Sequence, residues 1–155
     1  MKGSNVKGNI QRWRGEIPIS SLYTAGVGGQ IFFKALKERG ELVGARCDSC
    51  NQVYVPARQF CERCFAELSG QVPLKGTGTL KSYTSCYVDH DGKPTARPKM
   101  WALVQLDGAT TLFLHRLLEA NDAAQVRIGS KVEVVIKPRT RRRGSILDIE
   151  GFRLV

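Results

Sequence analysis

The chain has 155 residues and a mass of 17.2 kDa, a length typical of one domain or of two very small ones. Hydrophobic residues make up 42% and charged residues 25%, a composition that excludes a wholly disordered chain. No run approaches the ~20 consecutive apolar residues of a membrane span, and the first residues lack the apolar core of an export signal. We therefore expect a cytoplasmic protein without a membrane partner.

The charge balance is strongly basic. Twenty-four lysines and arginines against 14 acidic residues give a formal net charge of +10. A surplus of this size favours an anionic partner, which could be nucleic acid, a phosphorylated small molecule, an acidic lipid face or an acidic protein. The two histidines are His90 and His115, so any chemistry that needs an imidazole must use one of them.

Four of the five cysteines form two C-x2-C pairs with ten residues between them: Cys47, Cys50, Cys61 and Cys64. In each pair a tight turn can aim two thiolates at one metal ion, and two such turns complete a tetrahedron. Two disulfides are the alternative, which the missing export signal disfavours. We predict one structural Zn²⁺ per chain in a closed site that does no chemistry of its own. A rubredoxin-type iron site would use the same ligands, so the spacing leaves an electron carrier open.

The N-terminal third predicts an arm followed by a small metal-binding unit. Residues 1–27 hold four basic residues and one acidic residue without a periodic pattern, and we expect a basic extended arm. Its apolar residues can dock on another protein or pack on their own domain, and the sequence does not choose. Residues 30–39 predict a short helix, with Phe32, Phe33 and Leu36 on one face. Short strands at 42–46 and 52–55 and a second knuckle at 60–65 complete a zinc ribbon over 28–70.

Residues 71–155 change to strand patterns. We predict strands at 79–88, 100–106, 111–115, 131–137 and 146–155, with a short helix over 122–124 that Asn121 caps. Five strands with a helix between the third and fourth is the order of an OB-fold barrel. The predicted fold is therefore mainly β: an N-terminal arm and short helix, a rubredoxin-like zinc ribbon, and a five-stranded OB-fold barrel.

Two basic clusters lie in predicted loops of this barrel. The loop before the last strand holds four arginines, and the loop between the first two strands holds three further cations. Loops of this kind lie near one mouth of an OB barrel, so we expect the clusters to converge on an anion. A solvated hairpin tip explains the arginine run equally well. The seven residues are Arg139, Arg141, Arg142 and Arg143, with Lys93, Arg97 and Lys99.

No catalytic motif is present: the chain has no nucleophile elbow, no P-loop and no glycine-rich dinucleotide turn. His115 has no nucleophile partner in the pattern and is predicted to be structural. Cys86 is predicted to be a buried, inert thiol. Two interpretations remain. One is an accessory subunit of an enzyme that handles a phosphorylated cofactor. The other is a single-stranded nucleic-acid binder whose bases would stack on Tyr83, Tyr87, Trp101 and Phe113.

Several motifs together resemble a known family. They are residues 23–29 (YTAGVGG), 32–36 (FFKAL), the four-cysteine segment 46–68, and 144–149 (GSILDI). From about Leu22 onward the sequence is similar to the zinc-ribbon/OB-fold proteins that associate with thiolases and related acyl-CoA enzymes. The resemblance implies a non-catalytic but required subunit of an acyl-CoA acyltransferase complex, with a thiolase-fold partner. It also implies CoA or acyl-CoA at or near the interface, where the seven basic residues would contact CoA or the partner. Nucleic acid is then not the expected partner.

Overall fold

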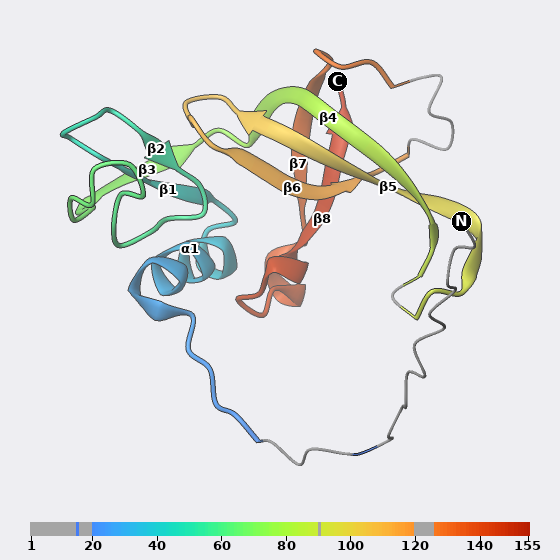
Figure 1. Ribbon diagram of the computed structural model, residues 1–155, viewed down its shortest axis with the longest axis horizontal. Coiled ribbons are helices and arrows are strands. Elements are labelled where there is room, and N and C mark those ends of the chain that lie inside the picture. The colour runs from blue at the N-terminus through green and yellow to red at the C-terminus, as the bar shows by residue number, and fades with distance from the viewer. Residues whose placement is uncertain (1–14, 16–19, 90, 120–125) are drawn as a thin grey trace, which may run out of the picture.

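The computed structural model describes residues 15, 20–89, 91–119 and 126–155 (Figure 1). The predicted mainly β class is confirmed. The elements in chain order are α1 (Gly26–Glu38), β1 (Leu42–Arg46), β2 (Val53–Tyr54), β3 (Gly70–Leu74), β4 (Thr77–Val88), β5 (Pro94–Leu106), β6 (Leu112–Leu117), β7 (Lys131–Ile136), the 3₁₀ turns η2 (Arg139–Arg141) and η3 (Ile146–Asp148), and β8 (Ile149–Leu154). The predicted helix over 122–124 and the apolar residues before Ser20 lie outside the described residues.

The ribbon is a three-stranded antiparallel sheet with β1 at its centre, in the order β2-β1-β3. We did not predict β3, because Gly70 and Pro73 are weak strand formers. The segment forms a strand because it pairs with β1. Figure 1 shows α1 lying beside this sheet, with the two cysteine-bearing loops beyond it. The ribbon sheet therefore includes residues up to Leu74.

Helix α1 begins at Gly26, four residues before its predicted start. Its buried residues, Gly28, Phe32, Ala35 and Leu36, recur at helical spacing on one face. Gly28 is needed for close approach, since a Cβ at this position would lie 2.6 Å from the carbonyl oxygen of Ala57. A larger residue would push the helix away from the loop that follows β2.

The second half of the chain closes into a barrel with the strand order β4-β5-β6-β8-β7. Numbered from one to five along the chain, these strands run 1-2-3-5-4, which is the OB-fold order, so the predicted barrel is confirmed. The predicted last strand is shorter than expected, because residues 146–148 form η3. Strand β5 is longer, so Arg97 and Lys99 lie in a strand and not in the predicted loop.

Ribbon and barrel share one apolar core and a set of hydrogen bonds. The ring of Phe113 on β6 lies 6.2 Å from Phe32 of α1 and 6.1 Å from Phe152 of β8, between centroids. In the turn after β5, Thr110 exchanges hydrogen bonds with Val53: its Oγ1 accepts from the Val53 N–H at 2.9 Å, and its N–H donates to the Val53 carbonyl at 2.9 Å. Thr111 Oγ1 accepts from the N–H of Val55 at 3.0 Å. The turn after β5 is therefore hydrogen-bonded to the edge strand of the ribbon, β2, and to the residue that follows it.

Within the described ranges, no helix has the length and apolarity that crossing a bilayer requires. Helix α1, the one α-helix among the residues that the structure describes, has 13 residues, whereas a membrane span needs about 20.

Candidate metal centre and anion site

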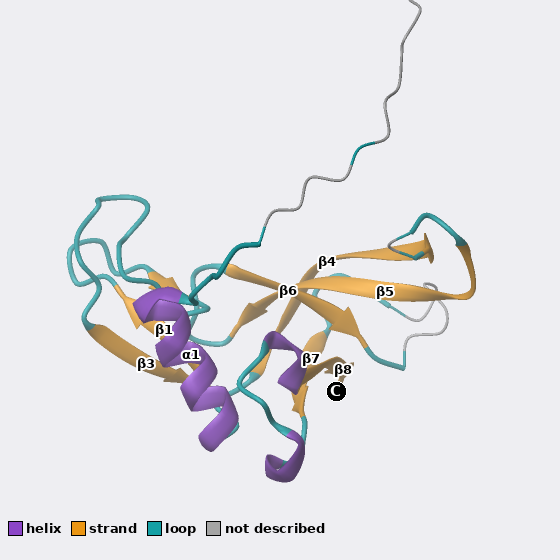
Figure 2. Cartoon of the chain, turned by 90° about the horizontal axis from the view of Figure 1, so that it is seen from below, coloured by secondary structure: helices purple, strands orange, loops and turns teal. Residues whose placement is uncertain are grey.

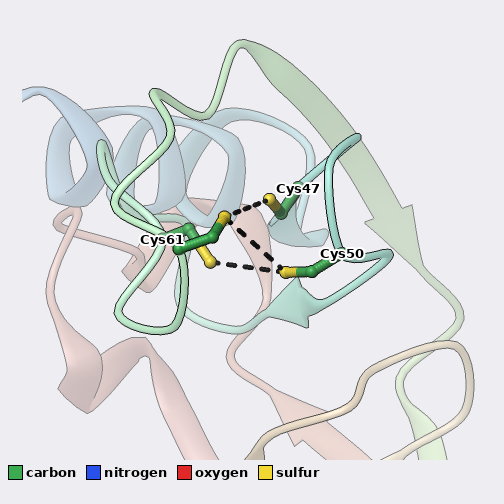
Figure 3. Close-up of side chains that lie close together, drawn as sticks. Cys47, Cys50 and Cys61 are labelled. Carbon is green, nitrogen blue, oxygen red and sulfur yellow. Dashed lines mark hydrogen bonds between the residues drawn. The ribbon is translucent and has the colours of Figure 1, made fainter.

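The four predicted ligand cysteines come together at one end of the ribbon. All four sulfurs lie within 4.8 Å of one another, with Cys47 Sγ 3.4 Å from Cys64 Sγ and Cys50 Sγ 3.6 Å from Cys61 Sγ. Figure 3 shows Cys47 and Cys50 on one side of the cluster and Cys61 on the other. Sulfurs that surround a zinc ion tetrahedrally at 2.3 Å lie about 3.8 Å apart. The cluster therefore fits one zinc ion, as predicted.

The two loops that carry the cysteines have matching backbone geometry. The N–H of Cys47 donates to the carbonyl of Gln52 at 2.7 Å, and the N–H of Cys61 donates to that of Ala66 at 2.9 Å. The residue after the second cysteine of each pair has a positive φ, 56° at Asn51 and 59° at Phe65. These turns aim both sulfurs of a pair to the same side, which is what the two-residue gap predicts.

Tyr54 contacts the cluster from within the core, a role that the sequence did not reveal. Its buried hydroxyl oxygen lies 3.2 Å from Cys61 Sγ, and the Arg58 guanidinium lies over its ring at 5.1 Å from the centroid. This hydrogen bond raises the pKa of Tyr54 to about 12 and lowers the pKa of Cys61 to about 6. The proton therefore stays on the phenol, which donates to a sulfur that carries the negative charge.

A cation is required to hold all four sulfurs as thiolates. Burial and the neighbouring thiols raise the pKa of Cys50 to about 12 when no metal offsets them. A bound Zn²⁺ deprotonates its thiol ligands outright. With four protein ligands the coordination sphere is closed, so the site stabilises the fold and leaves no position for a substrate.

The arginine loop between β7 and β8 is anchored by a buried carboxylate, Asp148, which is 2% exposed. Asp148 accepts hydrogen bonds from the backbone N–H groups of Arg143 at 2.9 Å, Gly144 at 2.7 Å and Ser145 at 3.2 Å. Burial alone would raise its pKa, but these three N–H groups and the charge of Lys137 hold the pKa below its usual value. Asp148 is therefore ionised and fixes the loop backbone.

The four arginines of this loop differ in their surroundings. Arg142 Nε donates to the carbonyl of Lys137 at 2.6 Å, and its guanidinium packs against Gly40, just after the end of α1. Arg139, Arg141 and Arg143 are exposed. Arg141 and Arg143 line a hollow of about 620 Å³, which Lys137 also lines. Asp148 also lines the hollow, but its charge is offset by the backbone N–H groups that it accepts from, so the hollow can hold an anion, and Arg142 serves to position its wall.

The second basic cluster does not join the first. Lys93 lies in the turn between β4 and β5, and Arg97 and Lys99 are exposed on β5. Figures 1 and 2 both show the far ends of β4 and β5 extending away from the barrel and from the η2–η3 loop. The predicted convergence is therefore wrong, because both strands continue as a two-stranded ribbon beyond the barrel wall.

The remaining candidates are structural or lie outside the described residues. His115 is buried, its ring stacks 6.4 Å from that of Phe113, and burial lowers its pKa, so it is neutral. Phe113 is itself in the core, so the prediction that it offers a stacking surface is wrong. Cys86 is half-buried, and not buried as predicted, with Lys99 as its cross-strand neighbour. His90 lies outside the described residues.

Replacing Cys61 with serine removes one of four zinc ligands. We expect Cys61→Ser to lose its zinc and to unfold the ribbon, because metal binding is part of the folding free energy of such a module. Metal analysis and circular dichroism measure both effects. Cys86→Ser, which changes a cysteine outside the cluster, should keep one zinc per chain. Full zinc occupancy in Cys61→Ser would contradict the assignment.

Tyr54→Phe keeps the buried ring and removes the hydrogen bond to Cys61. We expect this variant to bind zinc but to release it roughly 2- to 10-fold faster when a disulfide reagent attacks the thiolates, because the sulfur loses a donor that offsets its charge. A chromogenic chelator follows the release. Tyr87→Phe, at an exposed tyrosine, is the control. Equal release rates for the two variants would show that Tyr54 has no effect on the cluster.

Asp148→Asn should lower the free energy of unfolding by about 1.5–3 kcal/mol at neutral pH, since it removes charge-assisted hydrogen bonds to three N–H groups. The folded pKa of Asp148 lies below its unfolded value, so its stabilisation is present above about pH 4 and is lost as the pH falls through the folded pKa. The difference from the wild-type protein should shrink in that acid range, as urea unfolding at several pH values measures. Asp107→Asn, at an exposed carboxylate, should cost less than about 1 kcal/mol. A constant difference down to pH 2 would contradict this role.

The chain matches two family models in succession. Residues 35–69 match the rubredoxin-like zinc ribbon domain of ChsH2, and residues 71–137 match the C-terminal OB-fold domain of ChsH2. A DUF35 domain-containing scaffold protein of Methanocaldococcus jannaschii is 26% identical over 106 residues, which cover 68% of this chain and 74% of the relative. A protein of the same description from Methanothermobacter thermautotrophicus is 24% identical over 113 residues, 72% of this chain and 83% of the relative.

Two solved structures share the fold. A DUF35-family protein of unknown function from Sulfolobus solfataricus aligns with a TM-score of 0.62 at 25% identity, over 83% of this chain and 84% of the other. The Ltp2-ChsH2(DUF35) aldolase aligns with a TM-score of 0.57 at 24% identity, over 80% of this chain and 91% of that one. With its cysteine cluster and its barrel, the chain belongs to the zinc-ribbon/OB-fold family that the two ChsH2 models describe.

Proposed function

We propose that this protein is a non-catalytic accessory subunit of a heteromeric acyl-CoA enzyme. The observation that carries the proposal is the succession of two ChsH2-type modules, a zinc ribbon and an OB-fold barrel, over residues 35–137. A similar chain occurs in the Ltp2-ChsH2(DUF35) aldolase, and the curated relatives are described as scaffold proteins. A role in assembly suits a chain with this pair of modules.

The chemistry of the described residues also supports a non-catalytic subunit whose partner carries out the reaction. The four ribbon cysteines are committed to a closed metal site. His115 is buried, and its Nδ1 has no hydrogen-bond partner among the described residues, so it does not activate a nucleophile. What the chain offers is a rigid surface with exposed cations, so the partner subunit must supply the reacting groups.

The partner that we propose is a thiolase-fold subunit. Proteins of the family that the sequence resembles serve thiolases, hydratases and thiolase-like aldolases, and the small subunit of benzoylsuccinyl-CoA thiolase is one of them. The proposed reaction class is therefore acyl transfer to or from CoA, with this chain as a required subunit. A cytoplasmic location fits such a complex.

We assign the exposed arginines to the phosphates of CoA. CoA carries a pyrophosphate and a 3′-phosphate, and a guanidinium fork can bind two phosphate oxygens at once. Arg139, Arg141 and Arg143 are exposed on a loop that Asp148 holds in shape, whereas Arg142 is engaged within the chain. Lys93, Arg97 and Lys99 lie too far along the β4–β5 hairpin to share that ligand, and we assign them to an acidic face of the partner.

Two other functions lose support. A nucleic-acid binder of this fold stacks bases on several exposed aromatic rings, yet Tyr87 is the one exposed ring of the four predicted, since Phe113 is buried and Tyr83 and Trp101 are half-buried. A rubredoxin-like electron carrier needs iron, whereas the ribbon matches the model of a zinc ribbon. Tight binding of single-stranded oligonucleotides at physiological salt, or iron in the purified protein, would restore one of them.

Purification of the tagged chain from its native host tests the proposal. We expect a thiolase-fold subunit to co-purify, and we expect acyl-CoA turnover by the reconstituted complex but not by this chain alone. Mass spectrometry identifies the partner, and a thiolysis assay measures turnover. Robust turnover by the isolated chain, or the absence of any acyl-CoA enzyme from the complex, would overturn the proposal.

Two triple variants with the same change of charge separate the basic clusters. Replacing Arg139, Arg141 and Arg143 with alanine should leave assembly intact and raise the KM for CoA by about tenfold or more, since a desolvated charge-assisted contact contributes about 1.5–3 kcal/mol. Replacing Lys93, Arg97 and Lys99 with alanine should weaken assembly and leave that KM unchanged. If neither variant changes either quantity, both clusters are solvated and the assignments are wrong.

A further inference from the structure

Strand β6 presents leucines on its outer side. Burial alternates along the strand, with Phe113, His115 and Leu117 inside the barrel and the three residues between and before them outside. On a sheet that faces water, the outward positions are normally polar. On β6, however, Leu112 is 47% exposed and Leu114 is 58% exposed. Within the described residues, no segment buries these leucine side chains.

The leucines continue into a larger apolar area. Leu114 and Trp101 together line two hollows: a small one with Leu103, which lies across β4, β5 and β6, and one of about 600 Å³ between β6 and η3. The second hollow lies beside the shortest strand pairing of the closed barrel, where β6 and β8 pair at a single position, Leu117 with Phe152. In η3, Leu147 is 69% exposed and Ile146 is 38% exposed. We call Trp101, Leu103, Leu114, Ile146 and Leu147 the β6–η3 face.

Cations surround the β6–η3 face. Arg116 and Lys137 line its larger hollow, where the one acidic lining residue is Glu150. Leu147 also lines the hollow of Arg141 and Arg143, so the apolar face adjoins the proposed CoA site, whereas the rim of the face itself consists of Arg116 and Lys137. An apolar centre with a basic rim is complementary to a surface with an apolar centre and an acidic rim.

We propose that the β6–η3 face is the docking surface for a folded protein subunit whose contact area has an apolar centre and an acidic rim. The inference rests on the proposed function and names an apolar surface of this chain that binds the partner, in addition to the cations assigned to it on β4–β5. A second copy of the chain is disfavoured, because two copies would bring equal basic rims together and each carries a net charge of +10. Single-stranded nucleic acid is disfavoured too, since the face holds four aliphatic side chains and one half-buried aromatic ring.

A pair of charge-matched double variants tests the face. Leu114→Asp with Leu147→Asp places two carboxylates in the proposed contact. Ile128→Asp with Val155→Asp adds the same charge at two exposed aliphatic residues outside the face, and Figure 1 shows the C-terminus at the end of the barrel away from η3. Because all four residues are exposed, both proteins should retain one zinc and wild-type resistance to urea.

The readout is the dissociation constant for the thiolase-fold subunit that is recovered with the wild-type chain, measured by calorimetry. We expect the Leu114/Leu147 variant to bind at least about 100-fold more weakly, because burying a carboxylate in an apolar contact is costly. The control variant should stay within about threefold of the wild-type chain. Equal affinities for the two variants would overturn the inference while leaving the proposed function standing.

Other outcomes reassign the face or remove both proposals. A wild-type homodimer that the Leu114/Leu147 variant loses would give the face to a second copy, and oligonucleotide binding at physiological salt that this variant loses would give it to nucleic acid. Either result overturns the inference. If no acyl-CoA subunit assembles with the wild-type chain at all, the proposed function and the docking surface fall together.

Discussion

Everything in the ribbon depends on the demand of four closely spaced sulfurs for one cation. Sulfurs within 4.8 Å of one another cannot all carry negative charge in a partly buried site unless a metal offsets their repulsion. The two loops that carry them have little core of their own, so the metal is the link that holds them against β1 and α1. Tyr54 adds a neutral hydroxyl donor at Cys61, which spreads the thiolate charge into the core without adding a second cation. Fold and metal site are thus one thermodynamic unit.

The parts of the structure that were predictable from sequence are those with local causes. Each cysteine pair is fixed by one turn, and the alternation along β7 marks it as a strand without reference to a neighbour. Strand β3 and the first half of β5 were not predicted, because their strand conformation depends on pairing with other strands and not on a local sequence pattern. The roles of Tyr54 and Asp148 were missed for a different reason. Each role depends on contacts with atoms of other segments, and no sequence pattern around a single tyrosine or aspartate indicates such contacts.

Asp148 connects the two features on which the proposed function depends. Its carboxylate holds the backbone of Arg143 and Gly144, and it completes the capping box of η3 with Ser145. One buried charge therefore orients the exposed arginines on one side and Leu147 on the other. In a complex that binds a CoA phosphate at the edge of a protein interface, the phosphate site and the interface must be neighbours. Here the exposed arginines and Leu147 lie on the same short segment, so the ligand and the partner would contact adjacent residues.

The hydrogen bonds of Thr110 and Thr111 to β2 have a mechanical consequence. They tie a barrel turn to the ribbon edge at backbone level, while Phe32 and Phe113 fill the space behind it. The junction therefore has no free linker that could act as a hinge, and the two modules must rotate and translate together. For a subunit bound to the barrel, the zinc loops would therefore lie at a fixed distance and orientation relative to its binding surface. The protein would then act as a rigid scaffold, and the fixed geometry of its two modules would set the distance between the partners that bind them.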